Sequence, residues 1–147
     1  MKRALLLWVC WLSLVSLGWT AETEERYCLE SPGLFFDVRL RTQTWSEEGN
    51  PQGPFELYGH VHDLTLPEDD ACYVRFLQGS GRILPATEDT PPVADFTIVA
   101  HDPVCEQLIA RVAGRLDANP ITYSGYVRSL FRVSGLYAQL VSCEEHP

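Results

Sequence analysis

A chain of 147 residues, 46% of them hydrophobic and with a formal net charge of −9 at pH 7, is long enough for one domain with a buried core. That hydrophobic content is typical of a globular protein and excludes an intrinsically disordered chain. The negative charge disfavours binding to nucleic acid or anionic lipid and favours basic partners, cations or simple solubility. Composition therefore bounds the class of protein but identifies no reaction.

The first 21 residues have the layout of a secretory signal peptide. Two basic residues precede a short apolar run, and small side chains follow at Ser16 and Gly18. Cleavage after Gly18 fits best, with cleavage after Ala21 and retention of the segment as an anchor as alternatives. We expect residues 1–18 to be removed and residues 19–147 to form a single secreted or luminal domain. No later apolar stretch is long enough for a stable membrane span.

Four of the five cysteines follow the expected cleavage site, at Cys28, Cys72, Cys105 and Cys143. An even number of cysteines in an oxidising compartment predicts two disulfides. Of the possible pairings we favour the nested one, in which Cys28–Cys143 ties the ends of the domain and Cys72–Cys105 closes an inner loop. Zinc is disfavoured because the cysteines are widely spaced, with no Cys-x-x-Cys pair.

Alternation of apolar and polar residues predicts that most of the chain forms short strands. The pattern is clearest where Phe36, Val38 and Leu40 alternate with charged residues. Similar runs cover residues 55–61, 72–77, 96–100, 126–133 and 136–143. Gly, Pro and Asp residues predict loops at residues 49–54, 67–70 and 85–92, a tight reversal at residues 78–82, and a break at Ser134-Gly135.

The segment that begins at Asp102-Pro103 is ambiguous. Asp before Pro is the best signal for a helix start in this chain, because Asp caps the first turn and Pro suits its first position. Apolar residues then recur at every fourth position, which favours a short helix over residues 103–116, with a strand as the alternative. We expect a mainly β protein, an antiparallel β-sandwich of about seven strands with one short helix and two disulfides.

The segment from Tyr126 to Tyr137 carries the one family resemblance. A strand that contains aromatic residues is followed by Gly135-Leu136-Tyr137, then by apolar positions and Cys143. This arrangement resembles the closing strands of GOLD-type luminal domains, which occur in p24 cargo receptors and related Golgi receptors. Leu140 stands where the p24 pattern has a cysteine. The resemblance implies a GOLD-like domain that acts in secretory-pathway trafficking.

Histidines give the best constellation for catalysis. His60 and His62 share one face of a predicted strand, and with Asp63 or His101 they could form a metal site or an acid–base pair. Histidines at alternating positions of a polar strand face are more commonly surface residues. The acidic run at residues 68–70 lacks the ligand pattern of an EF-hand loop. We therefore expect no enzyme activity, no cofactor and no metal site.

Three classes of function remain. We favour a secreted or luminal, non-enzymatic module that binds another protein, whose identity the sequence does not give. A carrier of a small apolar ligand and a histidine-dependent hydrolase are the alternatives, and a wide apolar cavity would favour the carrier. The expected contact face is the aromatic-rich C-terminal hairpin, with Tyr123, Tyr126, Phe131 and Tyr137.

Overall fold

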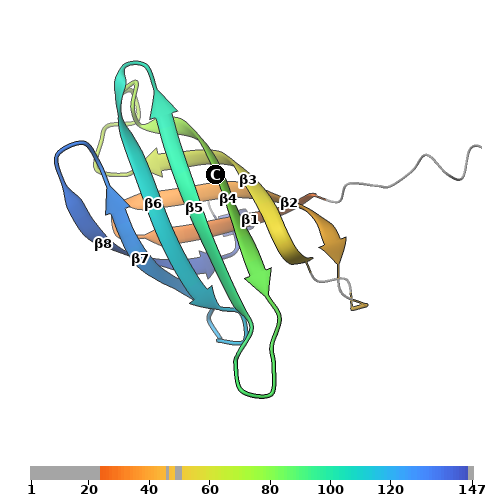
Figure 1. The fold of residues 1–147 in the computed structure, drawn as a ribbon. Coiled ribbons are helices and arrows are strands. Elements are labelled where there is room, and N and C mark those ends of the chain that lie inside the picture. Colours follow the sequence, from red (N-terminus) through yellow and green to blue (C-terminus); the bar gives the residue numbers. More distant parts are fainter. Residues whose placement is uncertain (1–23, 46, 49–50, 146–147) are drawn as a thin grey trace, which may run out of the picture.

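The structure is a computed structural model that describes residues 24–45, 47–48 and 51–145, so the expected signal peptide lies outside the described residues. In these residues eight antiparallel strands form a closed barrel, each strand paired with its neighbours along the chain (Figure 1). A short 3₁₀ turn, η1 (Cys143–Glu145), follows the last strand. The strands are β1 (Glu24–Ser31), β2 (Leu34–Trp45), β3 (Pro51–Asp63), β4 (Val74–Leu84), β5 (Val93–Asp102), β6 (Cys105–Arg115), β7 (Thr122–Arg128) and β8 (Val133–Val141).

The hydrophobic core is the interior of the barrel. Along β5, Ala94, Phe96, Ile98 and Ala100 are buried, and the residues between them are more exposed. Successive side chains of a strand point to opposite faces, so this alternation gives every strand one inner and one outer face. No helix among the described residues is long and apolar enough to cross a membrane.

The closed barrel corrects the predicted sandwich of about seven strands. Strands of a sandwich and of a barrel alternate in the same way, because each has one face toward the core in both architectures. What distinguishes them here is the pairing of the first strand with the last, through Cys28–Val141, Leu29–Leu140 and Glu30–Gln139. Such pairing joins distant parts of the chain and leaves no local pattern in the sequence.

The predicted short helix over residues 103–116 is wrong. These residues form most of β6, which pairs with β5 on one side and β7 on the other. The backbone N–H of Val104 donates a hydrogen bond to Asp102 Oδ1 at 3.0 Å, so the expected cap is made, but it closes a tight turn between two strands. The alternative of a strand is therefore correct.

Three other expected breaks lie wholly or partly inside strands. Of the loop expected at residues 49–54, residues 51–54 are the first residues of β3. β4 runs without interruption through Gly79 and Gly81, where a Cβ atom would lie 2.5 Å from the Thr97 carbonyl oxygen and 2.1 Å from the Asp95 carbonyl oxygen. These glycines allow β5 to approach closely instead of reversing the chain. The Ser134-Gly135 dipeptide lies in β8, and the turn before β8 occupies residues 129–132.

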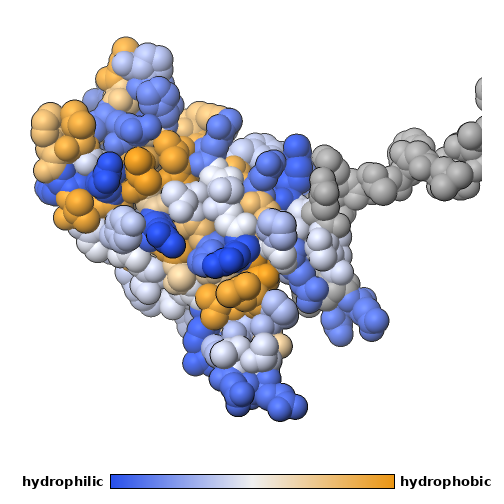
Figure 2. All heavy atoms as spheres, viewed as in Figure 1, coloured by the Kyte–Doolittle hydropathy of each residue, from blue (hydrophilic) through white to orange (hydrophobic). Residues whose placement is uncertain are grey.

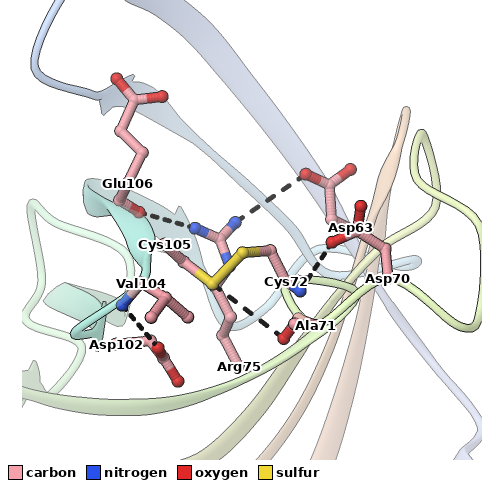
Figure 3. Close-up of a disulfide and its surroundings, with 9 residues drawn as sticks. All are labelled: Asp63, Asp70, Ala71, Cys72, Arg75, Asp102, Val104, Cys105 and Glu106. Carbon is pink, nitrogen blue, oxygen red and sulfur yellow. Dashed lines mark hydrogen bonds and ion pairs between the residues drawn. A yellow bond between two sulfur atoms is a disulfide. The ribbon is translucent and has the colours of Figure 1, made fainter.

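Both disulfides are present, with the nested pairing expected from the sequence. Cys28–Cys143 links β1 to η1, close to the place where β1 pairs with β8. Cys72–Cys105 links the loop before β4 to the start of β6 (Figure 3). One bridge therefore fastens the closing seam of the barrel, and the other fastens one of its ends.

Candidate functional site

At one end of the barrel β4 connects to β5 and β6 connects to β7 (Figure 1). The residues that line an apolar cavity lie at this end. Its volume is about 490 Å³. We call this end the open end. An eight-stranded barrel has an interior just wide enough to be filled by side chains or to hold one small ligand. Apolar side chains from most of the strands form the wall, among them Leu29, Val38, Leu40, Phe55, Phe96 and Leu140.

The charged side chains that line this cavity are acidic. Glu48 and Asp117 lie among its lining residues, and no Lys, Arg or His does so in the described part of the chain. Arg115 holds Asp117 through two hydrogen bonds of 3.0 and 2.9 Å. The hydrogen bond from Arg115 is the main reason that the pKa of Asp117 lies below its ordinary value. This carboxylate therefore stays ionised at neutral pH.

Two tyrosines bring polar groups into the apolar cavity. The hydroxyl of Tyr27, on β1, donates a hydrogen bond to Glu25 Oε2. Burial, followed by this bond to Glu25, raises the pKa of Tyr27 above its ordinary value. Tyr123, on β7, is only 8% exposed, and its burial likewise raises its pKa. Both phenols stay protonated at physiological pH and offer hydroxyl groups to the cavity.

The ring of Tyr123 is fixed by an edge-on contact with Phe96, with ring centroids 5.2 Å apart. Its hydroxyl makes no hydrogen bond to any other described residue. The hydroxyl oxygen is not one of the fully buried, unpartnered polar atoms of the described residues, so it borders the open space of the cavity. This hydroxyl is therefore a polar group of the cavity wall that can still bind a ligand.

The opposite end of the barrel is filled, and we call it the filled end. Arg75 on β4 is 4% exposed; its Nη1 donates to the Glu106 carbonyl oxygen at 2.8 Å, and its Nη2 lies 3.9 Å from Asp63 Oδ2 (Figure 3). The Cys72–Cys105 disulfide lies beside this guanidinium. The space left among the apolar side chains in this part of the core is only about 10 Å³. The mostly apolar cavity is therefore at the open end. A hollow of about 460 Å³ at the filled end lies between the β1–β2 turn and the β7–β8 hairpin, outside the packed core, and the charged Asp63 and Arg132 are part of its lining.

Among the described residues, His60, His62 and His101 do not come together as a group that could hold a metal ion. His60 and His101 are exposed, whereas His62 lies between the rings of Phe35 and Tyr73, with centroids 5.9 and 5.8 Å away. The acidic residues 68–70 lie in the loop between β3 and β4.

In the described part of the chain, one group of three potential metal ligands has its atoms within 4.8 Å of one another: Cys28, Asp37 and Cys143. Its two sulfur atoms are already joined as a disulfide. A disulfide sulfur is no thiolate, and thiolates are the metal-binding form of cysteine. The group therefore offers one carboxylate and no site.

The four aromatic residues expected at a contact face are divided by the structure. Tyr126, Phe131 and Tyr137 are 44%, 87% and 55% exposed, whereas Tyr123 points inward and lines the cavity. β8 pairs with β1 only through residues 139–141, so the β7–β8 hairpin extends past the β1–β2 turn. Its tip carries large apolar side chains in full contact with solvent.

Sequence reasoning missed several members of this exposed set. Leu130 and Val133, on the same hairpin, are 78% and 64% exposed, and Val104 at the tip of β5–β6 is 78% exposed. Figure 2 shows apolar surface at both hairpin tips. The backbone N–H of Leu130 donates to Glu106 Oε1 at 3.1 Å, which holds the two tips together. The sequence signal for this exposed apolar tip was the run from Leu130 to Val133, which the alternation of apolar and polar residues predicts as part of a strand.

The residues of the cavity were also missed as a site. Glu25, Tyr27 and Leu29 share one face of β1. On the other face Glu24, Arg26 and Glu30 are exposed, and Cys28 is buried in its disulfide. Such a pattern predicts a strand face, but it does not tell a packed face from a cavity wall.

Comparison of the chain with protein-family models, curated proteins and solved structures finds no match.

Proposed function

We propose that this protein is a carrier that binds one small apolar ligand inside its barrel. The observation that supports this function is the 490 Å³ cavity, which is walled by apolar side chains and lies at one end of a barrel whose other end is filled. Binding sites for small molecules typically enclose about 300–1,000 Å³ and combine a mostly apolar wall with a few placed polar groups. The two tyrosines are polar groups of this kind.

The architecture suits a container that exists before the ligand arrives. Closure of the sheet gives every described strand a partner on both sides for at least part of its length, and Cys28–Cys143 fastens β1 beside its pairing with β8. A preformed cavity lowers the cost of ordering side chains on binding. Two disulfides are consistent with an oxidising extracellular or luminal compartment, where an apolar compound needs a protein to move through water.

The test is binding of N-phenyl-1-naphthylamine, an uncharged apolar dye that fluoresces when it leaves water. We expect one dye per protein. Ala94 is 4% exposed and lines the cavity, so Ala94→Phe fills part of the space and weakens dye binding at least tenfold. Ala113→Phe, on the outer face of β6, adds the same atoms outside the cavity and leaves dye binding unchanged.

A thermal melt of each variant separates lost binding from lost folding. Ile121→Trp, a second variant among the lining residues, tests the same space without a change in the strands. The carrier function is wrong if the wild-type protein does not bind the dye. It is also wrong if folded Ala94→Phe and Ile121→Trp both bind it as the wild type does.

A second candidate function, binding to another protein, is supported by the exposed apolar tip of the β7–β8 hairpin. Leu130 and Phe131 are flanked by Arg128 and Arg132, which form no ion pair with another described residue. Apolar anchors with a rim of arginine suit a partner surface that is apolar at its centre and acidic at its edge. A partner recovered with the wild-type protein should be lost with Phe131→Ser and retained with Leu84→Ser, which changes an exposed side chain of another strand.

A further inference from the structure

The polar groups in the cavity wall specify the chemistry of the ligand. Tyr27 and Tyr123 both line the cavity, one from β1 and one from β7. Both strands begin at the open end, where Tyr27 is the fourth residue of β1 and Tyr123 the second residue of β7, and β8 alone separates these two strands in the barrel. The proton of the Tyr27 hydroxyl is directed at Glu25. One side of the cavity therefore presents two neighbouring hydroxyl groups in different hydrogen-bonding states.

The two hydroxyl groups have opposite hydrogen-bonding roles toward a ligand: Tyr123 can donate and Tyr27 can accept. Tyr123 is more than nine-tenths buried, and its O–H has no acceptor among the described residues. Tyr27 uses its proton on Glu25, so its oxygen keeps lone pairs that can accept a hydrogen bond. A ligand that satisfies both must accept a bond from Tyr123 and donate one to Tyr27.

The charges around the cavity exclude an anionic ligand. No described Lys, Arg or His lines it, and the carboxylates at or beside it are those of Glu25, Glu48 and Asp117. The cation beside it, Arg115, is already engaged by both oxygens of Asp117. A ligand carboxylate would lose its water without gaining a cation, and it would lie near like charges. An ammonium group would suit the carboxylates but has no lone pair to accept the bond from Tyr123.

We propose that the ligand is an apolar molecule that ends in an uncharged hydroxyl group. This inference rests on the proposed carrier function. The hydroxyl oxygen accepts a hydrogen bond from Tyr123, and the hydroxyl proton is donated to the oxygen of Tyr27. The apolar part of the ligand lies against the aliphatic and aromatic wall of the cavity.

The experiment compares three competitors that share one alkyl chain and differ only in the end group: 1-decanol, decylamine and decanoate. Each displaces N-phenyl-1-naphthylamine from the wild-type protein at neutral pH. We expect 1-decanol to displace the dye at a concentration at least tenfold lower than either charged competitor. Tenfold is the size of effect expected for about one hydrogen bond made or lost in a buried site.

Two variants connect the preference to the named side chains. Tyr123→Phe removes one hydroxyl and keeps the ring, so we expect the affinity for 1-decanol, measured against the dye affinity of the same variant, to fall about tenfold. Tyr137→Phe, on the outer face of the adjacent strand, is the matched control and changes neither affinity. Glu25→Gln removes the negative charge beside Tyr27 and narrows the gap between 1-decanol and decanoate.

The outcomes separate this inference from the carrier function. If the wild-type protein does not bind the dye, the carrier function itself is wrong. If it binds the dye but decanoate or decylamine competes as well as 1-decanol, the carrier function stands and the hydroxyl specificity is overturned. Unchanged affinity of 1-decanol for Tyr123→Phe would also overturn it.

Discussion

Replacement of Arg75 tests how the filled end of the barrel is held. The side chain is 4% exposed, so its removal acts on both packing and polar contacts. Arg75→Ala removes most of this buried side chain, and a large-to-small change at a buried position costs about 3 kcal/mol. Arg75→Met keeps most of the volume and loses the guanidinium.

For Arg75→Met, the polar contributions to the free energy of unfolding that are lost and gained are nearly equal. The variant loses the charge-assisted hydrogen bond to the Glu106 carbonyl oxygen, which is worth about 2 kcal/mol. The ion pair with Asp63 spans 3.9 Å to a carboxylate that is partly exposed, so it contributes less than about 1 kcal/mol. Against these losses, the variant no longer buries a charged group whose Nε lacks a partner among the described residues.

We therefore expect Arg75→Met to change the free energy of unfolding by about 1 kcal/mol or less, and Arg75→Ala to lower it by about 3 kcal/mol. Urea unfolding followed by intrinsic fluorescence measures both. Dye binding at the open end should survive Arg75→Met, because the cavity has no contact with this side chain. A methionine variant as unstable as the alanine variant would refute the reasoning, since the polar contacts and not the volume would then hold this end.

Two further predictions concern stability. Replacing both Cys72 and Cys105 by serine removes a disulfide between residues 33 positions apart. We expect the free energy of unfolding, measured with urea, to fall by about 4 kcal/mol, because the unfolded chain is no longer constrained by this loop. A loss below about 1 kcal/mol would contradict this reasoning. Asp37 accepts hydrogen bonds of 2.9 and 2.7 Å from Arg26. These hydrogen bonds are the main reason that the pKa of Asp37 lies below its ordinary value of 3.8. A lowered carboxyl pKa gives stability that is complete above the ordinary value and is lost as the pH falls through the lowered one. Between pH 5 and pH 2 the wild-type protein should therefore lose more stability than Asp37→Asn, and equal losses would exclude this pair as a cause.

The sequence predicted local structure well and closure poorly. The alternation of Phe36, Val38 and Leu40 identified a strand with a buried face, and the spacing of the cysteines indicated the nested bridges. Asp102 was recognised as a cap, but the same hydrogen bond to the second following N–H closes a turn between strands. The choice between helix and strand at this point depends on pairing with β5 and β7, which are separate segments of the chain.

The cavity could not be predicted from the pattern of single strands. Tyr123 carries an apolar ring and a hydroxyl, so the sequence is compatible with an outer contact residue or an inner one. Its place is decided by the register of β7, in which Tyr123 pairs with Gly114 and Ala138 and so points toward Phe96. Whether an inner residue is packed or lines a cavity also depends on the sizes of the side chains that all the remaining strands place at the same height along the barrel axis.

The two proposed activities lie at opposite ends of the barrel and are therefore separable. Arg75 and the Cys72–Cys105 bridge hold the filled end, so a ligand enters and leaves through the open end. The exposed Phe131 lies on a hairpin of the filled end and contributes nothing to the cavity wall. A partner bound at Phe131 leaves the mouth of the cavity free, so the loaded and empty forms can bind the same partner. Loss of dye binding in Ala94→Phe with partner binding retained, and the reverse in Phe131→Ser, is the pattern that this arrangement requires.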